Sequence, residues 1–289
     1  MSEGKFFGPW LARAEKTEQT PLNALARREF LGQFARGGLV IGAALAVGGM
    51  ESVAASAADA TAKLEPEGAG TLQELTQKLA AAPRVRSFKR VPMILTDAGQ
   101  WDDEALNLVI GYRGHGKQVW DNTDIASPWL NLMRNSLNAQ VWSYKHPNFL
   151  CASATHGTAH LALYDAYIWE KYSISKVLKG KYRHNIFLDI PKAVAGKNPA
   201  DFNDPTGLFS PEANCIPLLM QRGVVFLACH NAIWEFSGKL IKSGRNPDHL
   251  SHEALAAELT NHLIAGAVLT PGIVATLPML EAAGFAYAK

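Results

Sequence analysis

The residue with the clearest chemical potential is Cys229, which follows the continuous apolar run Gly-Val-Val-Phe-Leu-Ala at 223–228. Residues 232–242 then place apolar side chains at helical spacing before Gly244, so a strand is expected to end where a helix begins. Unpaired N–H groups in the first turn of that helix would point at the sulfur and favour its thiolate. The pattern predicts a nucleophilic thiol of lowered pKa, to which His230 could add positive charge. The alternative is a buried, inert cysteine that fills the strand end.

A second group of residues has types and spacing that suit a metal ion. His156 and His160 are four residues apart and would share one face of a helix that includes both. Cys151 lies five residues before His156, and we expect it at the carboxyl edge of the sheet, where α/β proteins bind ligands. Cys151, His156 and His160 are therefore candidate metal ligands, with Cys229 as a further member of such a site. The alternative is that His156 caps a helix and His160 is half-buried.

Other signatures of enzyme chemistry are weaker. Acidic residues gather at Asp97 and at 102–104, but carboxylates are also favoured at the start of a helix, which explains them without an acid–base role. The sequence contains no Gly-rich phosphate loop, no Gly-x-Ser-x-Gly elbow and no Cys-x-x-Cys pair. Nucleotide-dependent enzymes and serine hydrolases are therefore disfavoured.

The elements that must position these side chains alternate between strand and helix along the chain. Fully apolar strands that alternate with helices predict an α/β fold with a mainly parallel sheet of five strands, or slightly more, and helices on both faces. Residues 191–211 consist mostly of turn-forming residues and predict a long loop of the kind used as a lid or binding loop. We expect strands at 91–95, 148–153, 185–190, 223–228 and 267–272, and helices at 72–79, 102–111, from 127 onward, and at 158–172, 232–242, 251–263 and 273–283.

The composition is that of an ordinary globular protein. Of the 289 residues, 48% are hydrophobic and 19% are charged, and the formal net charge is +2. A chain so close to neutral predicts no basic surface for nucleic acid.

The first 57 residues have the order of zones found in an export signal. The paired arginines Arg27 and Arg28, followed by Glu-Phe-Leu, resemble the twin-arginine motif, although Ala26 and Gly32 depart from its usual residues. The apolar run 39–47 is too short to span a membrane, and Ala-Ser-Ala at 55–57 suits a signal peptidase. We expect export by the Tat translocase to a bacterial periplasm and cleavage near residue 57. The alternative is an uncleaved leader that tethers the protein to the membrane.

In its second half the chain resembles the DsrE/DsrF family of small sulfur-relay proteins. The resemblance lies in Gly-Val-Val-Phe-Leu-Ala-Cys-His-Asn-Ala-Ile at 223–233 and in the run 269–287, which ends Gly-Phe-Ala-Tyr. It implies a DsrE-like domain over 148–289, whose first strand and helix are 149–153 and 159–172. It also implies that Cys229 can carry a persulfide and that the protein forms a homo-oligomer. The aromatic-rich N-terminal region and the loop at 191–211 depart from the family, so its partners do not transfer.

These observations predict a signal peptide at 1–57, a tether with a short helix at 58–84, an N-terminal extension at 85–147 and the DsrE-like domain at 148–289. The favoured function is sulfur or redox handling through Cys229, with a small sulfur compound or a sulfur-carrier protein as partner. One alternative is a non-catalytic periplasmic protein that binds a metal ion or a small ligand. Another is a structural subunit of an exported complex.

Overall fold

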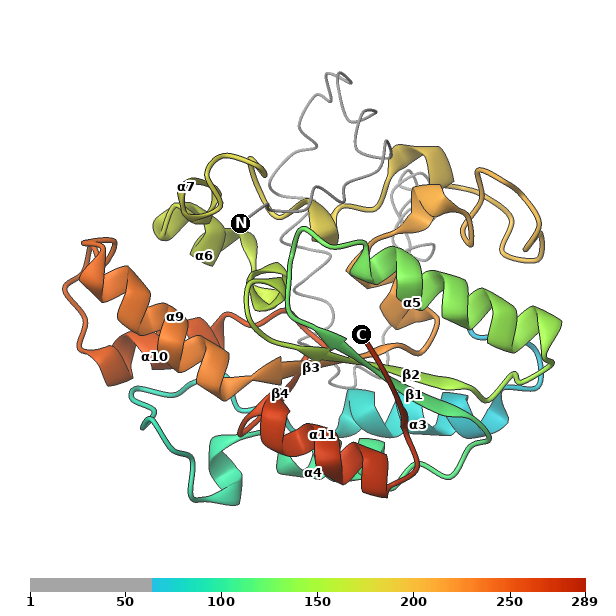
Figure 1. The fold of residues 1–289 in the computed structure, drawn as a ribbon, viewed down its shortest axis with the longest axis horizontal. Helices are drawn as coiled ribbons and strands as arrows, with labels where there is room; N and C mark the ends of the chain where they lie inside the picture. The colour runs from blue at the N-terminus through green and yellow to red at the C-terminus, as the bar shows by residue number, and fades with distance from the viewer. Residues whose placement is uncertain (1–63) are drawn as a thin grey trace, which may run out of the picture. The chain divides into compact units, whose positions relative to one another are not determined.

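The computed structural model describes residues 64–289, so the predicted signal peptide and the first residues of the predicted tether lie outside the described part. The described chain forms a five-stranded sheet in which every pairing is parallel (Figure 1), and the strand order is β4-β3-β2-β1-β5. This confirms the predicted α/β class and the size of the sheet. The strands are β1 (Lys117–Asn122), β2 (Leu150–Thr155), β3 (Val225–Cys229), β4 (Val268–Thr270) and β5 (Ala286–Ala288).

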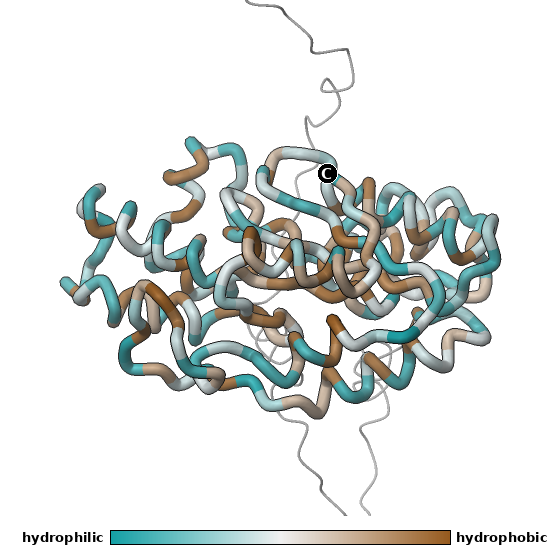
Figure 2. The backbone as a smooth tube through the Cα atoms, turned by 60° about the horizontal axis from the view of Figure 1, so that its bottom comes forward, coloured by the Kyte–Doolittle hydropathy of each residue, from teal (hydrophilic) through white to brown (hydrophobic). Residues whose placement is uncertain are grey.

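Helices cover both faces of the sheet, as the apolar strands require. Every residue of β2 and β3 is buried, and alternate residues belong to two separate apolar clusters. Figure 2 shows the apolar segments gathered toward the middle of the molecule and the polar segments in the outer loops. The first face packs against α5 (Trp129–Asn138), α8 (Ile216–Gln221), α9 (His230–Lys242) and α10 (His252–Asn261), and the second against α3 (Gly70–Ala81), α4 (Asp103–Ile110) and α11 (Ile273–Ala282).

The strand order determines where side chains from distant segments meet. From β1 to β4 the chain adds each strand beside the previous one, and it then returns so that β5 pairs with the other side of β1. In open parallel sheets, ligands bind outside the carboxyl ends of the strands, where the strand order reverses. In this fold the reversal lies between β1 and β5.

The predicted division at residue 148 is wrong. The strand β1 lies in the interior of the sheet, between β2 and β5, so the region 85–147 is part of the domain and not an extension of it. Helix α3 also belongs to the fold, because Leu72 and Leu75 are buried in the second cluster. The short helix predicted at 72–79 is therefore confirmed, but the prediction that it lies in a tether is wrong.

Two predicted strands are absent from the described chain. Residues 91–95 form no strand, since Pro92 has no N–H for a ladder and Ile94 is exposed. Over 185–190 the chain forms only a short 3₁₀ turn, with Ile186 exposed and the Asn185 side chain bonded to the backbone oxygens of Ala162 and Tyr164.

The remaining helical segments are short, and the predicted loop at 191–211 is mostly irregular. Val194 and Phe209 of that loop are buried in a third small apolar cluster, which they share with residues outside the loop. Within residues 64–289, no helix combines the length and the apolar character that a membrane span requires. The short segments are η2 (Ala98–Gln100), η3 (Ala139–Ser143), η4 (Ala159–Leu163), α6 (Ala166–Lys171), α7 (Ile174–Val177), η5 (Ile186–Leu188), η6 (Lys192–Val194) and η7 (Pro211–Ala213).

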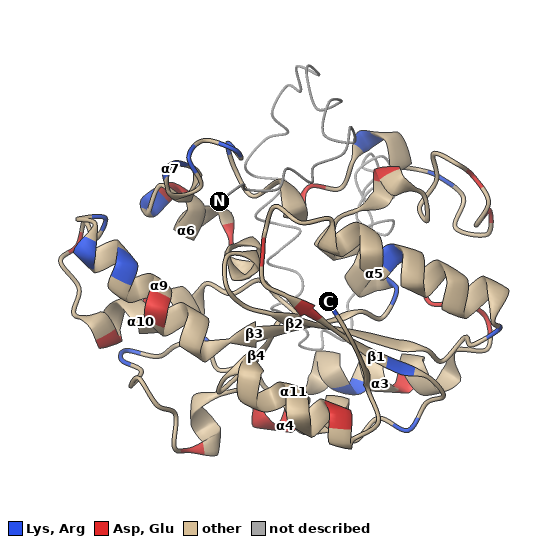
Figure 3. Ribbon diagram, viewed as in Figure 1, with Lys and Arg blue, Asp and Glu red and all other residues tan. Residues whose placement is uncertain are grey.

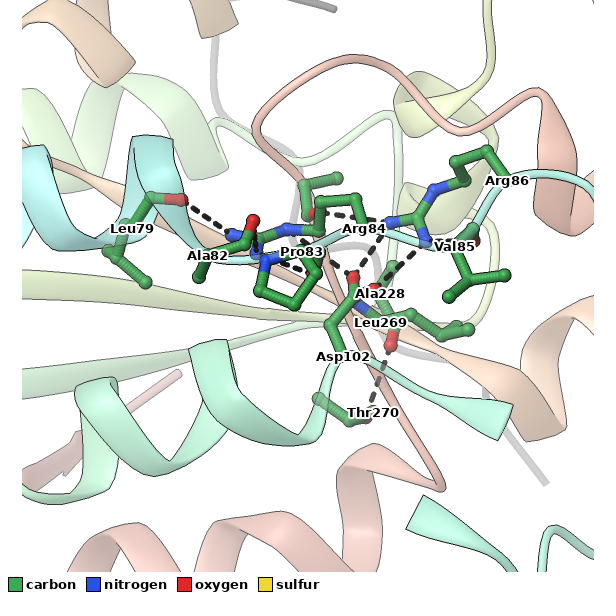
Figure 4. A network of polar contacts seen from close by, with 11 residues as sticks. Leu79, Ala82, Pro83, Arg84, Val85, Arg86, Asp102, Ala228, Leu269 and Thr270 are labelled. Carbon is green, nitrogen blue, oxygen red and sulfur yellow. Dashed lines mark hydrogen bonds and ion pairs between the residues drawn. The ribbon is translucent and has the colours of Figure 1, made fainter. Parts of the chain in front are cut away.

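Charged residues of both signs are interspersed along the outer helices and loops (Figure 3), but Asp102 is buried. Its carboxylate accepts hydrogen bonds from both terminal nitrogens of Arg86, at 3.0 and 2.7 Å, and from the backbone N–H of Leu269 at 2.7 Å (Figure 4). The backbone N–H of Asp102 donates to the Leu269 oxygen at 3.1 Å. Leu269 lies in the edge strand β4, so Asp102 satisfies backbone groups that have no strand partner on that side.

Replacing Asp102 should therefore destabilise the fold. In Asp102→Asn, Arg86 loses its buried anionic partner and one of the two acceptor oxygens becomes an NH2 donor, so we expect the free energy of unfolding to fall by about 3 kcal/mol. Glu104→Gln is the matched control, because Glu104 is an exposed carboxylate two residues away, in the first turn of α4. Urea unfolding of both variants measures the difference. Equal midpoints for the two variants would show that the Asp102 network does not hold β4.

Candidate functional site

Cys229 is the last residue of β3 and the N-cap of α9, which confirms the predicted strand–helix junction. Its sulfur accepts a hydrogen bond from the backbone N–H of Ile273, the first residue of α11, at 3.4 Å. The N–H groups of Asn231 and Ala232, in the first turn of α9, also stabilise the thiolate. The sulfur therefore faces the N-termini of two helices, where partial positive charge favours an anion.

Burial nevertheless outweighs these backbone contacts. Cys229 is only 3% exposed. Desolvation raises the pKa of its thiol, and the N–H groups of Ile273, Ala232 and Asn231 offset that effect only in part. The prediction of a lowered pKa is thus wrong, because it considered the helix N-terminus without the loss of water.

His230 does not supply the predicted positive charge. The side chain is buried, and its Nε2 lies 2.8 Å from the backbone oxygen of Pro92. Burial lowers the pKa of His230, so the imidazole is neutral at physiological pH.

The structure does not gather Cys151, His156 and His160 around one point. Cys151 lies near the start of β2 and His156 just beyond its end, so about five residues, or ~16 Å, separate them along the strand. Cys151 is therefore not at the carboxyl edge, and that expectation is wrong. His160 lies in the 3₁₀ helix η4, where it is buried against Tyr164, and burial lowers its pKa to about 3. Among the described residues, no three His, Cys, Asp or Glu side chains are placed to hold a metal ion.

Cys151 and Cys229 also do not pair with each other. The two strands are in register at Ala152 and Val225, which places Cys151 beside Val224 and far from Cys229. The two sulfurs also belong to clusters on opposite faces of the sheet. All three cysteines are free and buried, and burial raises the pKa of Cys151 and of Cys215 to about 12.

A polar cluster that the sequence did not reveal occupies the carboxyl edge where the strand order reverses. Asp121 of β1 accepts a hydrogen bond from Tyr287 of β5 at 2.7 Å, and its other oxygen lies 2.6 Å from His156 Nε2. Burial alone would raise the pKa of Asp121, but the hydrogen bonds from His156 and Tyr287 hold it below its usual value. Asp121 therefore remains anionic and orients the imidazole, whose side chain is 20% exposed. The sequence feature that could have revealed this cluster is the strand β1, which carries Asp121 and is absent from the predicted strands.

A close contact between two loops holds His156 in place. The backbone N–H of Thr158 donates to the Thr123 oxygen at 2.9 Å, and that of Ala159 to the same oxygen at 3.3 Å. Gly157, between His156 and Thr158, has φ +56°, and a Cβ there would come within 2.4 Å of the Thr123 oxygen. Only glycine therefore allows the loop after β2 to approach the loop after β1 this closely.

A surface groove between α9 and α10 lies apart from this chemistry. Its lining includes Trp234, Lys239, Leu250 and His252, and none of the predicted site residues.

The fold and the two sites define an α/β protein with a cysteine at a strand–helix junction and a His–Asp pair at the same edge of its sheet. Comparisons with protein-family models, curated proteins and solved structures found no significant match.

Substituting Gly157 should disturb the site more than substituting a glycine in open space. Gly180 is the matched control, because its φ is also positive, at +75°, and a Cβ there would meet no atom within 4 Å. Gly180→Ala should cost only the left-handed strain of about 1–2 kcal/mol. Gly157→Ala adds a clash worth a further ~1–3 kcal/mol. Thermal unfolding compares the two, and equal losses would contradict the proposed close contact.

Proposed function

We propose that this chain is an exported, DsrE-like protein that handles sulfur in the periplasm, with Cys229 as the residue that takes up a sulfur atom. The observation that carries the proposal is the position of the Cys229 sulfur between the first turns of α9 and α11. A persulfide is an anion at the end of the cysteine side chain, and convergent backbone N–H groups suit such a group.

The order of elements supports the resemblance to the DsrE/DsrF family. A strand ends in Cys229, a helix follows, and β4 and α11 lead to the closing residues Gly284-Phe-Ala-Tyr287. The resemblance extends this proposal to a small sulfur compound or a sulfur-carrier protein as partner, and to a homo-oligomer.

The proposed location depends on the signal at 1–57, which includes Arg27 and Arg28. An oxidising compartment endangers exposed thiols, and burial of all three cysteines protects them. The same burial raises the pKa of Cys151 and Cys215, so these thiols are expected to be inert.

Treatment of the folded protein with inorganic polysulfide should place one persulfide on Cys229 and none on the other cysteines. Tandem mass spectrometry of the labelled protein locates the added sulfur. Cys229→Ser should abolish the label, whereas Cys151→Ser should retain it and serves as the matched control. Label on Cys151 or Cys215, or unlabelled wild-type protein, would contradict the proposal.

A further inference from the structure

The parallel ladders bring His156 beside Cys229. Thr155 and Ala228 are partners in the register of β2 and β3, and the next residue on each strand is His156 and Cys229. At His156 and Cys229 both backbones are still paired with a neighbouring strand. The N–H of His156 donates to the Asn122 oxygen at 3.0 Å, and Cys229 pairs with Thr270. Neighbouring strands lie about 4.8 Å apart, so the two residues are adjacent across the sheet.

Alternation along the strands directs the relevant side chains to one face. Val119 of β1, Ala154 of β2 and Cys229 of β3 all belong to the second apolar cluster. Asp121 and His156 each follow a member of that cluster by two residues, so they project from the same face as Cys229. The 2.6 Å contact between Asp121 and His156 agrees with this placement.

The hydrogen bonds of His156 leave one ring nitrogen for chemistry. When Nε2 donates to Asp121, Nδ1 carries a lone pair, and Nδ1 makes no hydrogen bond within residues 64–289. The second carboxylate oxygen is held by Tyr287, so the orientation of Asp121 is fixed from both sides. A His–carboxylate pair beside a thiol is the arrangement that activates a cysteine nucleophile.

The site also needs a base. Because burial raises the pKa of Cys229, the surrounding N–H groups alone leave the thiol protonated at neutral pH. A neighbouring group that accepts the proton removes that barrier.

We infer that His156, oriented by Asp121, accepts the proton of the Cys229 thiol, and that the sulfur donor is a small polysulfide or persulfide. The choice of sulfur donor rests on the proposed function, whereas the role of His156 does not. Asp121 and Tyr287 are positioning residues. A protein donor is disfavoured because Cys229 is only 3% exposed, so a small molecule fits the site better than a protein surface does.

The transfer is balanced without an added oxidant. The thiol proton moves to His156 Nδ1, and the thiolate attacks the outer sulfur of the donor. An S–S bond forms to Cys229 as the S–S bond of the donor breaks. The departing donor thiolate then takes the proton from His156, which restores the neutral imidazole.

Two reagents separate the role of His156 from the proposed function. Methyl methanethiosulfonate converts a thiolate into a methyl disulfide with release of methanesulfinate, so its rate at Cys229 reports activation alone. Inorganic polysulfide reports sulfur uptake. The variants are His156→Gln, which can still donate to Asp121 but cannot accept a proton, and His156→Ala with and without added imidazole. Tyr287→Phe is a milder change to the site, because it removes only the hydrogen bond to Asp121 and leaves His156 in place.

We expect His156→Gln to slow both reactions at Cys229 by roughly 100-fold, with an unchanged melting temperature. Imidazole should restore much of the rate in His156→Ala, an effect that a structural role would not produce. Equal methanethiosulfonate rates in wild-type protein and His156→Gln would overturn the inference, as would a wild-type Cys229 that does not react. If methanethiosulfonate reacts and depends on His156 while polysulfide adds no sulfur, the proposed function fails and the role of His156 stands.

Discussion

The parallel hydrogen-bond ladder through β1, β2 and β3 determines where the side chains of the candidate site lie. It brings the carboxyl ends of these three strands to one edge and sets which residues are neighbours there. Asp121, His156 and Cys229 come from three separate segments of the chain and meet at that edge only because the strands are parallel and in this register. A register shift of one residue in any of these strands would turn the site residue of that strand to the opposite face of the sheet.

Two opposing electrostatic effects act on Cys229. The N-termini of α9 and α11 favour the thiolate, whereas burial favours the neutral thiol, and burial is the larger effect. A buried, protonated thiol is protected from oxidation and requires a proton acceptor before it can react. The Asp121–His156 pair is anionic at the carboxylate and partly exposed at the imidazole, which suits it to that role.

Much of the fold was predictable because β3 is continuously apolar, β2 is largely so, and the helices α4 and α9 show clear periodicity. β1 was missed because Lys117–Asn122 mixes polar and apolar residues, and its strand character comes from pairing on both sides. Asp121 was missed along with it. By contrast, 185–190 is apolar enough for a strand, but Asn185 bonds to backbone oxygens near η4 and the segment closes into a 3₁₀ turn.

The candidate site was predictable in part for a similar reason. Local pattern was enough to place Cys229 at a strand end. It could not show that the chain forms a 3₁₀ helix after Gly157, which separates the roles of His156 and His160. Nor could it show that Tyr287 returns to the same edge, because that contact depends on the pairing of β5 with β1.

We propose that Cys229 carries sulfur, and native mass spectrometry of the protein purified from its own cells without reductant tests this directly. We expect a mass excess of one or more sulfur atoms that maps to Cys229 and disappears on reduction. A bare polypeptide mass, or an excess that a chelator removes, would contradict it.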